Sequence, residues 1–331
     1  MPGGEERALR RRIRSVQSTK KITRAMELIA ASQIVRSLTR MTANRPYRDG
    51  MARIVVEAAR GDPAAAEKLL GEPKERHGVV VLSIVADRGL AGAYNASTLR
   101  ATERLIADLS AQGVATRLFT VGKKASSYFR FRRQPVERAF QGMSERPSWA
   151  DARAVAAAVS APFLAGEVDQ VLLLSTRYRS AGSQAVEIHQ LLPVPEPGRS
   201  RIAATGAGGE EARAEGGGAE GGEPPPGAGA APAVQQEPAG IGYTEFEPDV
   251  ETLLSRLAPR AVESEIFTAM LEGAASFFTA QQRAMAAASD NADELIRTLT
   301  RVMNRARQDA ITTEIMEIVG GAEALRSSKG A

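Results

Sequence analysis

The stretch "ADRGLAGAYN", residues 86–95, holds the side chains best placed to do chemistry. It follows an apolar run and precedes a helical pattern, so it would lie where a strand turns into a helix. There, Gly89 and Gly92 would let the backbone approach an anion at the helix N-terminus. Alternatively, Asp87 and Arg88 would pair locally in a tight turn that binds nothing. The residues favour the plain turn, and the anion site is the alternative.

Two glycine-containing stretches resemble phosphate-binding loops, and both depart from the pattern. The stretch "FTVGKKASS", 119–127, contains the Gly-Lys pair of a Walker loop. However, Arg117 stands five positions before Gly122, where the loop needs glycine, and Lys124 replaces the Ser or Thr that would hold magnesium. A Gly-x-Gly-x-x-Gly match begins at Gly216, but it lies in an acidic low-complexity tract that no strand precedes. Neither stretch predicts a nucleotide site.

The sequence offers few other reactive groups. It contains two histidines, His77 and His189, and no cysteine, which excludes disulfides, thiolate nucleophiles and cysteine metal sites. Glu314 and Glu317 lie one turn apart on a helical pattern, where solvated carboxylates are commoner than catalytic ones. The signatures of common serine hydrolases and zinc proteases are also missing. We therefore expect no catalytic residue, no metal and no cofactor.

Charge is distributed unevenly along the chain of 331 residues. The formal net charge is +4, but residues 7–60 carry fourteen Lys and Arg against three acids. Residues 260–331 are nearly balanced, with eight basic and ten acidic side chains. No run approaches the ~18 apolar residues that would span a membrane, and the start lacks the apolar core of a secretory signal. We expect no direct membrane span and a chain that stays in the compartment where it is made.

The basic segment 7–60 reads as one long helix. Its apolar residues recur three and four positions apart, as at Ile22 and Met26. At 1.5 Å per residue such a helix would reach ~80 Å. Pro46 removes a backbone hydrogen bond, so we expect a bend near Arg45.

The middle of the chain has the pattern of an α/β domain. Apolar runs rich in valine and leucine indicate buried parallel strands, and the amphipathic stretches between them indicate helices. The expected strands are 77–85, 114–122 and 168–176, and the expected helices are 97–110 and 149–164. This alternation predicts a Rossmann-like α/β domain.

A tract of different composition follows this domain. It consists of Gly, Ala, Pro and Glu with hardly any apolar bulk, so we expect it to be disordered. Helical spacing returns after Pro259, a favourable first-turn residue. The apolar rhythm includes Ile311 and Ile315 and continues to Arg326.

The two terminal helices are too long for the domain between them. The second would reach ~100 Å, whereas the middle domain should be only ~35 Å across. Each helix has an apolar stripe to bury, and the simplest partner is the other helix. The predicted parts are an N-terminal coiled-coil helix, a central α/β domain, a disordered insertion and a C-terminal coiled-coil helix, at 1–62, 77–197, 198–240 and 259–326.

Three separated stretches carry a resemblance to a known family. They are "RRRIRSVQSTKKITRAMELIAASQ" with the later "RPY", the strand-end stretch "ADRGLAGAYN", and "MAAASDNADELIRTLTRVMNRARQDAITTEIMEIVGGAEAL". In this order they resemble the start, the strand-end motif and the carboxyl-terminal signature of the ATP synthase gamma subunit.

The resemblance implies a rotary shaft rather than an enzyme. In that family the terminal helices form an antiparallel, left-handed coiled coil inside the ring of alternating alpha and beta subunits. The α/β domain sits at the base with the epsilon subunit, on the membrane c-ring. ATP is made on the beta subunits, and the gamma subunit transmits the torque that couples proton flow to synthesis. The expected location is the cytoplasmic side of a bacterial cell membrane, as a peripheral protein.

The resemblance also assigns residues to contacts. The segment that faces the acidic lever loop of the beta subunit contains Lys20, Lys21, Arg24 and Met26. The segment that meets the catch loops of the ring contains Arg307 and Gln308. The tip that turns in an apolar sleeve runs from Ile318 to Leu325. The strand-end motif contributes Asp87, Arg88, Gly89 and Gly92.

Several residues depart from the family pattern. In the strand-end motif Ala91 replaces the usual cysteine and Ala86 the usual serine. Phe277 takes a glutamate position, and Gln281 replaces an arginine that normally meets a catch loop, which puts that contact in doubt. The adjacent Phe277 and Phe278 suggest tight burial, which we expect against a neighbouring subunit.

Three questions stay open at this point. The insertion is either inert or a tether that touches the stator and regulates hydrolysis. The basic start also suits a nucleic-acid-binding coiled coil, but no aromatic residue is interleaved with it before Tyr47. A nucleotide-dependent α/β enzyme with helical arms is the third class. We expect protein partners and no nucleic acid, because neither alternative explains the carboxyl-terminal signature.

Overall fold

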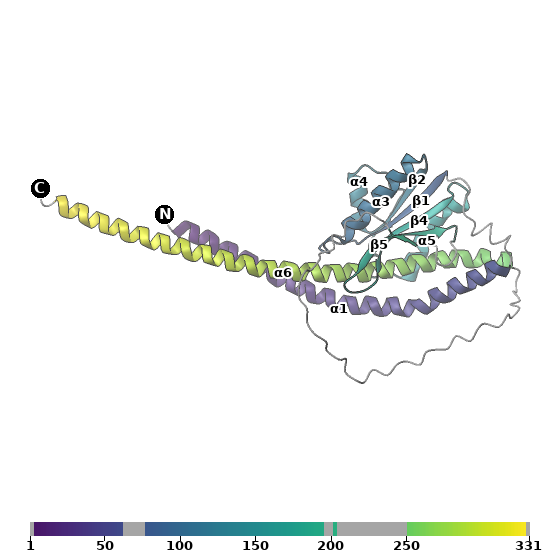
Figure 1. Ribbon diagram of the computed structural model, residues 1–331, viewed down its shortest axis with the longest axis horizontal. Coiled ribbons are helices and arrows are strands. Elements are labelled where there is room, and N and C mark those ends of the chain that lie inside the picture. The colour runs from purple at the N-terminus through teal and green to yellow at the C-terminus, as the bar shows by residue number, and fades with distance from the viewer. Residues whose placement is uncertain (1–2, 62–76, 195–200, 204–249, 329–331) are drawn as a thin grey trace, which may run out of the picture.

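Two long helices run side by side, and a six-stranded sheet with its own helices packs against them (Figure 1). The computed structural model describes residues 3–61, 77–194, 201–203 and 250–328. Among these residues, no helix is long and apolar enough to cross a membrane.

The two long helices are antiparallel. Helix α1 covers Gly3–Gly61 and helix α6 covers Val250–Ser328, so their lengths are about 90 and 120 Å at 1.5 Å per residue. Both chain termini therefore lie toward the same end of the molecule (Figure 1). This arrangement, with the α/β domain between the helices in sequence, confirms the predicted fold class.

The contacts between α1 and α6 fix their register. Thr23 Oγ1 lies 2.7 Å from Ser289 Oγ, and Lys20 Nζ donates to Asp293 Oδ1 at 2.6 Å. The two residue numbers in each pair add up to 312 or 313, so Gly3 lies opposite about residue 310. Beyond that point α6 continues without α1 beside it.

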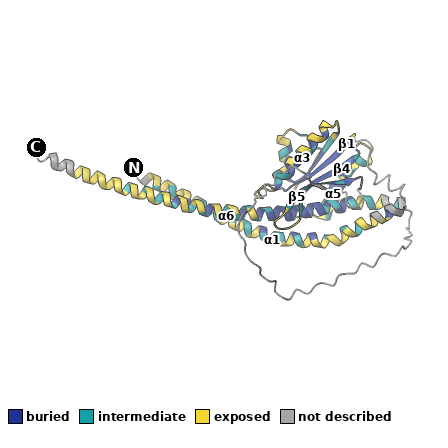
Figure 2. Cartoon of the chain, in the orientation of Figure 1, coloured by how far each residue is buried: buried dark blue, intermediate teal, exposed yellow. Residues whose placement is uncertain are grey.

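The far end of α6 is exposed as a result (Figure 2). Its exposed large apolar side chains are Ile311, Ile315, Met316, Ile318 and Val319. The apolar rhythm of this segment predicted burial against α1. That prediction is wrong among the described residues, because α1 begins at Gly3 and therefore does not extend beside this segment of α6.

Both prolines of the long helices lie inside them. Pro46 is within α1, which curves toward the domain in this part, and Pro259 is within α6, which begins nine residues earlier. The prediction that Pro259 starts the helix is therefore wrong. Each proline leaves one carbonyl four residues earlier without its usual donor, on Thr42 and Ser255. Both of these residues are exposed, so water can satisfy the carbonyls and the helix continues.

The sheet has the strand order β3-β2-β1-β4-β5-β6. The strands are β1 Gly78–Ile84, β2 Ala115–Val121, β3 Arg138–Phe140, β4 Gln170–Tyr178, β5 Gln184–Leu192 and β6 Arg201–Ala203. Strands β1, β2 and β4 are parallel, as predicted, and β3 is parallel to β2, whereas β5 is antiparallel to β4 and β6 to β5. Sequence reasoning missed β3, β5 and β6.

Strand β6 lies inside the tract that we predicted to be disordered, so the prediction is wrong at 201–203. The segment "RIA" pairs with the edge strand β5. The edge of β5 offers backbone N–H and C=O groups that its composition does not reveal. The rest of 198–240 lies outside the described residues.

Helices cover both faces of the sheet. Helices α3 (Tyr94–Ala111) and α4 (Lys123–Phe131) pack on one face, and α5 (Trp149–Leu164) packs with α6 on the other. Successive residues of the run "VVVL" in β1 therefore reach opposite cores, which explains why the whole run is apolar. Helix α6 is a layer of this domain and, farther along, half of the two-helix rod.

Candidate functional site

The strand-end motif is held together by one carboxylate. Asp87 accepts hydrogen bonds from the backbone N–H groups of Lys123 (2.9 Å) and Gly142 (3.0 Å) and from Ser144 Oγ (2.6 Å). Burial of Asp87 raises its pKa, but the bonds from Ser144, Gly142 and Lys123 together outweigh that effect, so the pKa lies below its usual range. The ionised carboxylate thus joins the ends of β1, β2 and β3.

The rest of the motif forms a closed turn. The Asn95 side chain accepts from the Ala86 N–H and donates to the Arg88 carbonyl, both at 3.0 Å. Leu90 and Gly92 have positive φ angles of 62° and 54°, which make the sharp change of direction. The helix that follows the motif is α3, and its first N–H, on Tyr94, donates to the Ala91 carbonyl at 3.2 Å, so these contacts support the plain turn over an anion site. The expected local pair of Asp87 with Arg88 is wrong, because Arg88 pairs with Glu145 instead.

Helix α6 lies across the crevice where Rossmann-type sheets bind ligands, because Ser276 of α6 contacts Thr176 near the carboxyl end of β4 and Phe277 packs near Ala86 after β1. A cavity of about 420 Å³ remains there, and Ala280 and Ala284 of α6 form one of its walls. Arg283 of α6 hydrogen-bonds the Gln184 side chain at the start of β5. The position of a bound nucleotide in other Rossmann folds is thus partly filled by this chain's own helix.

The two phenylalanines are buried within the chain. Phe277 packs edge-on against Tyr94 and Phe278, with ring centroids 5.7 and 5.2 Å apart, and the cluster includes Ala86 and Ala91. The expectation of burial against a neighbouring subunit is therefore wrong. Ala86 and Ala91 are themselves departures from the family motif, and their small side chains adjoin the two rings. Sequence reasoning treated these departures separately, although they belong to one cluster.

The basic residues assigned to a partner by resemblance have different surroundings. Lys20 is paired with Asp293 across the two helices, and Arg24 makes two hydrogen bonds to Glu27 of its own helix. Lys21 is exposed. Lys20 and Arg24 lie four residues apart on one face of α1, and each already has an acidic partner within the chain.

Met26 lines a hollow of about 580 Å³ where α1 meets the domain. Arg88 of the strand-end motif and Gln281 of α6 line it too, and Glu145 pairs with Arg88 at 3.1 Å. Burial raises the pKa of Glu145, and the positive charge of Arg88 opposes this rise. The hollow therefore brings two sequence-predicted segments together.

The residues predicted for the far end lie on α6. Arg307 and Gln308 are exposed near the point where α1 begins, and Ile318 is exposed beyond it. Leu325 lies on the helical backbone of α6, but its side chain is outside the described residues.

The Lys20–Asp293 pair is expected to contribute little to stability. Both side chains are about two-fifths exposed, at 38% and 42%, so solvent screens the attraction. Lys20→Ala should lower the free energy of unfolding by at most ~1 kcal/mol. Chemical denaturation measures this, with Asp293→Ala as the matched control. A loss several times larger in either variant would contradict the expectation.

Comparisons with known proteins agree along the whole chain. A family model described as ATP synthase matches residues 5–325. The ATP synthase gamma chain of Parafrankia sp. is 43% identical over 330 residues, covering 98% of this chain and 99% of the relative. That of Frankia casuarinae is 44% identical, with the same coverage, and that of Kineococcus radiotolerans is 40% identical over 98% of both chains.

Solved structures share the fold at lower identity. A chain from the Euglena gracilis mitochondrial ATP synthase (OSCP/F1/c-ring) has a TM-score of 0.61 at 16% identity, covering 99% of this chain and 97% of its own. A chain from the Tetrahymena thermophila central stalk and c-ring has a TM-score of 0.55 at 20% identity, covering 81% and 99%. With the family match and the full-length relatives, the conclusion is that this chain belongs to the ATP synthase gamma chain family, whose members are non-catalytic subunits of that complex.

Proposed function

We propose that this chain is the rotor of the central stalk, which couples proton flow through a membrane ring to ATP synthesis on beta subunits by rotation. The observation that carries the proposal is the pair α1 and α6, here called the shaft, which extends far beyond the domain and is asymmetric about its axis. A stiff, off-centre rod can present different faces in turn to surrounding subunits. In this proposal residues 77–194 form the base.

The proposed partners follow from the two ends of the molecule. The alpha and beta subunits surround the shaft, and the epsilon subunit and the c-ring bind the base. The similar structures support this, since they come from assemblies that contain F1, the c-ring and the central stalk. The chain would then be a peripheral protein on the cytoplasmic side of the cell membrane.

The exposed side chains of the shaft suit contacts with partner subunits that form and break as the shaft rotates. Lys21 and Arg24 are exposed cations on α1, and they would attract acidic lever loops over a distance without fixed bidentate pairs. Arg307 and Gln308 would meet the catch loops, and the exposed apolar end around Ile318 would turn in an apolar sleeve.

Rotation can be tested directly because the chain has no cysteine of its own. A single Ser110→Cys on the exposed end of α3 would carry a bead, with the alpha–beta ring fixed to a surface. We expect the bead to rotate in one direction when ATP is added. As the matched control, Gln308→Cys cross-linked to the ring should stop both rotation and hydrolysis. ATP hydrolysis with a stationary bead, or undiminished hydrolysis after cross-linking, would refute the proposal.

A further inference from the structure

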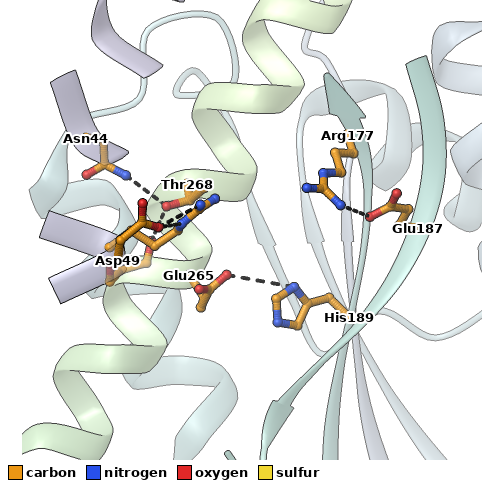
Figure 3. Close-up of polar contacts among 9 residues, drawn as sticks. Asn44, Asp49, Arg177, Glu187, His189, Glu265 and Thr268 are labelled. Carbon is orange, nitrogen blue, oxygen red and sulfur yellow. Dashed lines mark hydrogen bonds and ion pairs between the residues drawn. The ribbon is translucent and has the colours of Figure 1, made fainter. Parts of the chain in front are cut away.

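One face of α1 contacts both α6 and the α/β domain. Arg40, Asn44 and Tyr47 are spaced four and three residues apart, so they share a face of the helix. Arg40 donates to the backbone carbonyl of Pro147, just before α5. Asn44 Nδ2 donates to Thr268 Oγ1 of α6 at 2.8 Å (Figure 3). Within two turns, α1 is therefore attached both to α6 and to the base.

The third residue of this face meets the only tryptophan in the sequence. The ring of Trp149 lies edge-on to Tyr47 of α1, at 5.3 Å between centroids and 90° between planes. It also lies edge-on to Phe267 of α6, at 5.2 Å and 71°. Such edge-to-face pairs are favourable beyond the area that they bury. One side chain of α5 thus touches both helices of the shaft.

The backbone that carries Trp149 is itself held firmly. Trp149 is the first residue of α5, and Ser148 caps this helix. Ser148 Oγ accepts from the Asp151 N–H, while the Asp151 carboxylate accepts from the Ser148 N–H at 2.8 Å. This reciprocal pair fixes the first turn of α5. The indole is therefore presented from a rigid point of the base.

The contact coincides with a weak point of α1. Pro46, next to Tyr47, has no N–H, so the carbonyl of Thr42 lacks its helical donor. A helix bends most readily where a backbone bond is missing. The contacts of Arg40, Asn44 and Tyr47 hold α1 in place on both sides of this gap.

We infer that Trp149 is a positioning residue through which torque passes between the base and both helices of the shaft. The inference rests on the proposed function, because it concerns the route by which rotation of the base reaches α1 and α6. The three rings, Tyr47, Trp149 and Phe267, are called the aromatic clasp below. Without the clasp, α1 could bend at Pro46 under load instead of turning with the base.

The clasp can first be tested on the full chain alone. Tyr47→Leu should shift the emission of the single tryptophan to longer wavelength and make it easier to quench. A double-mutant cycle of Tyr47→Leu and Trp149→Leu should show a coupling of about fivefold in the unfolding equilibrium constant. Tyr128→Leu is the matched control, because Tyr128 forms a similar ring pair with Phe129, at 5.4 Å and 86°, within α4. It should leave the tryptophan emission unchanged.

The torque role needs the reconstituted complex in vesicles. Trp149→Ala should lower the number of protons pumped per ATP hydrolysed, while hydrolysis by the ring and shaft detached from the membrane stays at the wild-type rate. Trp149→Phe should restore pumping, because phenylalanine keeps an edge-to-face ring. A residue that only stabilised the fold would change both activities together, through the amount of assembled complex.

The outcomes separate this inference from the proposed function. An unchanged emission and no coupling in the cycle would overturn the clasp, whether or not the shaft rotates. Coupling in the cycle with wild-type pumping by Trp149→Ala would overturn the torque role and leave the rotor proposal standing. A bead that stays still on the wild-type chain would refute the rotor proposal and the torque role together, while the clasp measured in the isolated chain would stand.

Discussion

Gly122→Ala is expected to cost roughly 3–5 kcal/mol of the free energy of unfolding. Gly122 has a φ of +99°, and a Cβ placed there would lie 2.3 Å from the Val85 carbonyl oxygen, far inside normal contact. The atoms in the way are backbone at the end of β1, so they cannot move aside as a flexible side chain could. The substitution would separate the ends of β1 and β2, where the strand-end motif is built.

Gly113→Ala is the matched control for this change. Gly113 also has a positive φ, +76°, but nothing lies within 4 Å of its added Cβ. Only backbone strain remains, so we expect a loss of ~1 kcal/mol. Urea denaturation followed by circular dichroism measures both variants. Equal losses would show that the close approach to Val85 is not what requires glycine at position 122.

Asp87→Asn is expected to lower the free energy of unfolding by ~2 kcal/mol at neutral pH. The carboxylate accepts from two separate segments, one at Lys123 and one at Gly142 and Ser144. In asparagine the amide nitrogen is itself a donor, so it would face these donors without an acceptor. The substitution should also loosen the turn that follows β1. Denaturation at several pH values measures both the size of the loss and its pH dependence.

The pH dependence has a definite sign. The folded-state pKa of Asp87 is lowered, so its stabilising contribution is fully present above the unfolded pKa of about 4 and disappears as pH falls through the folded value. The difference between wild type and Asp87→Asn should therefore be constant at neutral pH and shrink below about pH 4. Asp169→Asn is the control, since Asp169 accepts two backbone hydrogen bonds, from the His77 and Gly78 N–H groups, and should cost less. A difference that grew toward low pH would contradict the assignment.

Periodicity was sufficient to predict the long helices and the parallel strands β1, β2 and β4, because each has an apolar signal. It failed for β5, whose sequence "QAVEIHQLL" mixes polar and apolar residues. Two of those polar residues have partners on other elements: Glu187 meets Arg177 of β4, and His189 meets Glu265 of α6 (Figure 3). Such pairs join residues far apart in sequence, so no local pattern reveals them.

The candidate site was predictable only in part. The turn at Asp87 could be inferred from glycine spacing and from its position after a strand. The donors to that carboxylate could not, since Gly142 and Ser144 lie more than fifty residues away. The pairing of Lys20 with Asp293 depends on the register of two helices at opposite ends of the chain. Register follows from packing in three dimensions, which apolar rhythm alone does not specify.

The alternative classes gain no support from the described residues. The cations at the start of α1 are partly engaged by Asp293 and Glu27, which reduces their value for phosphate contacts. The crevice that would suit a nucleotide is walled by α6. Both features agree with membership of the gamma chain family.

The uncovered end of α6 has a consequence for how the complex is put together. A helix end with several exposed isoleucines invites self-association whenever the subunit is free in solution. Enclosure by other subunits would remove that hazard. During assembly of the complex, we therefore expect the alpha and beta subunits to bind this end of α6 before the base binds the membrane ring.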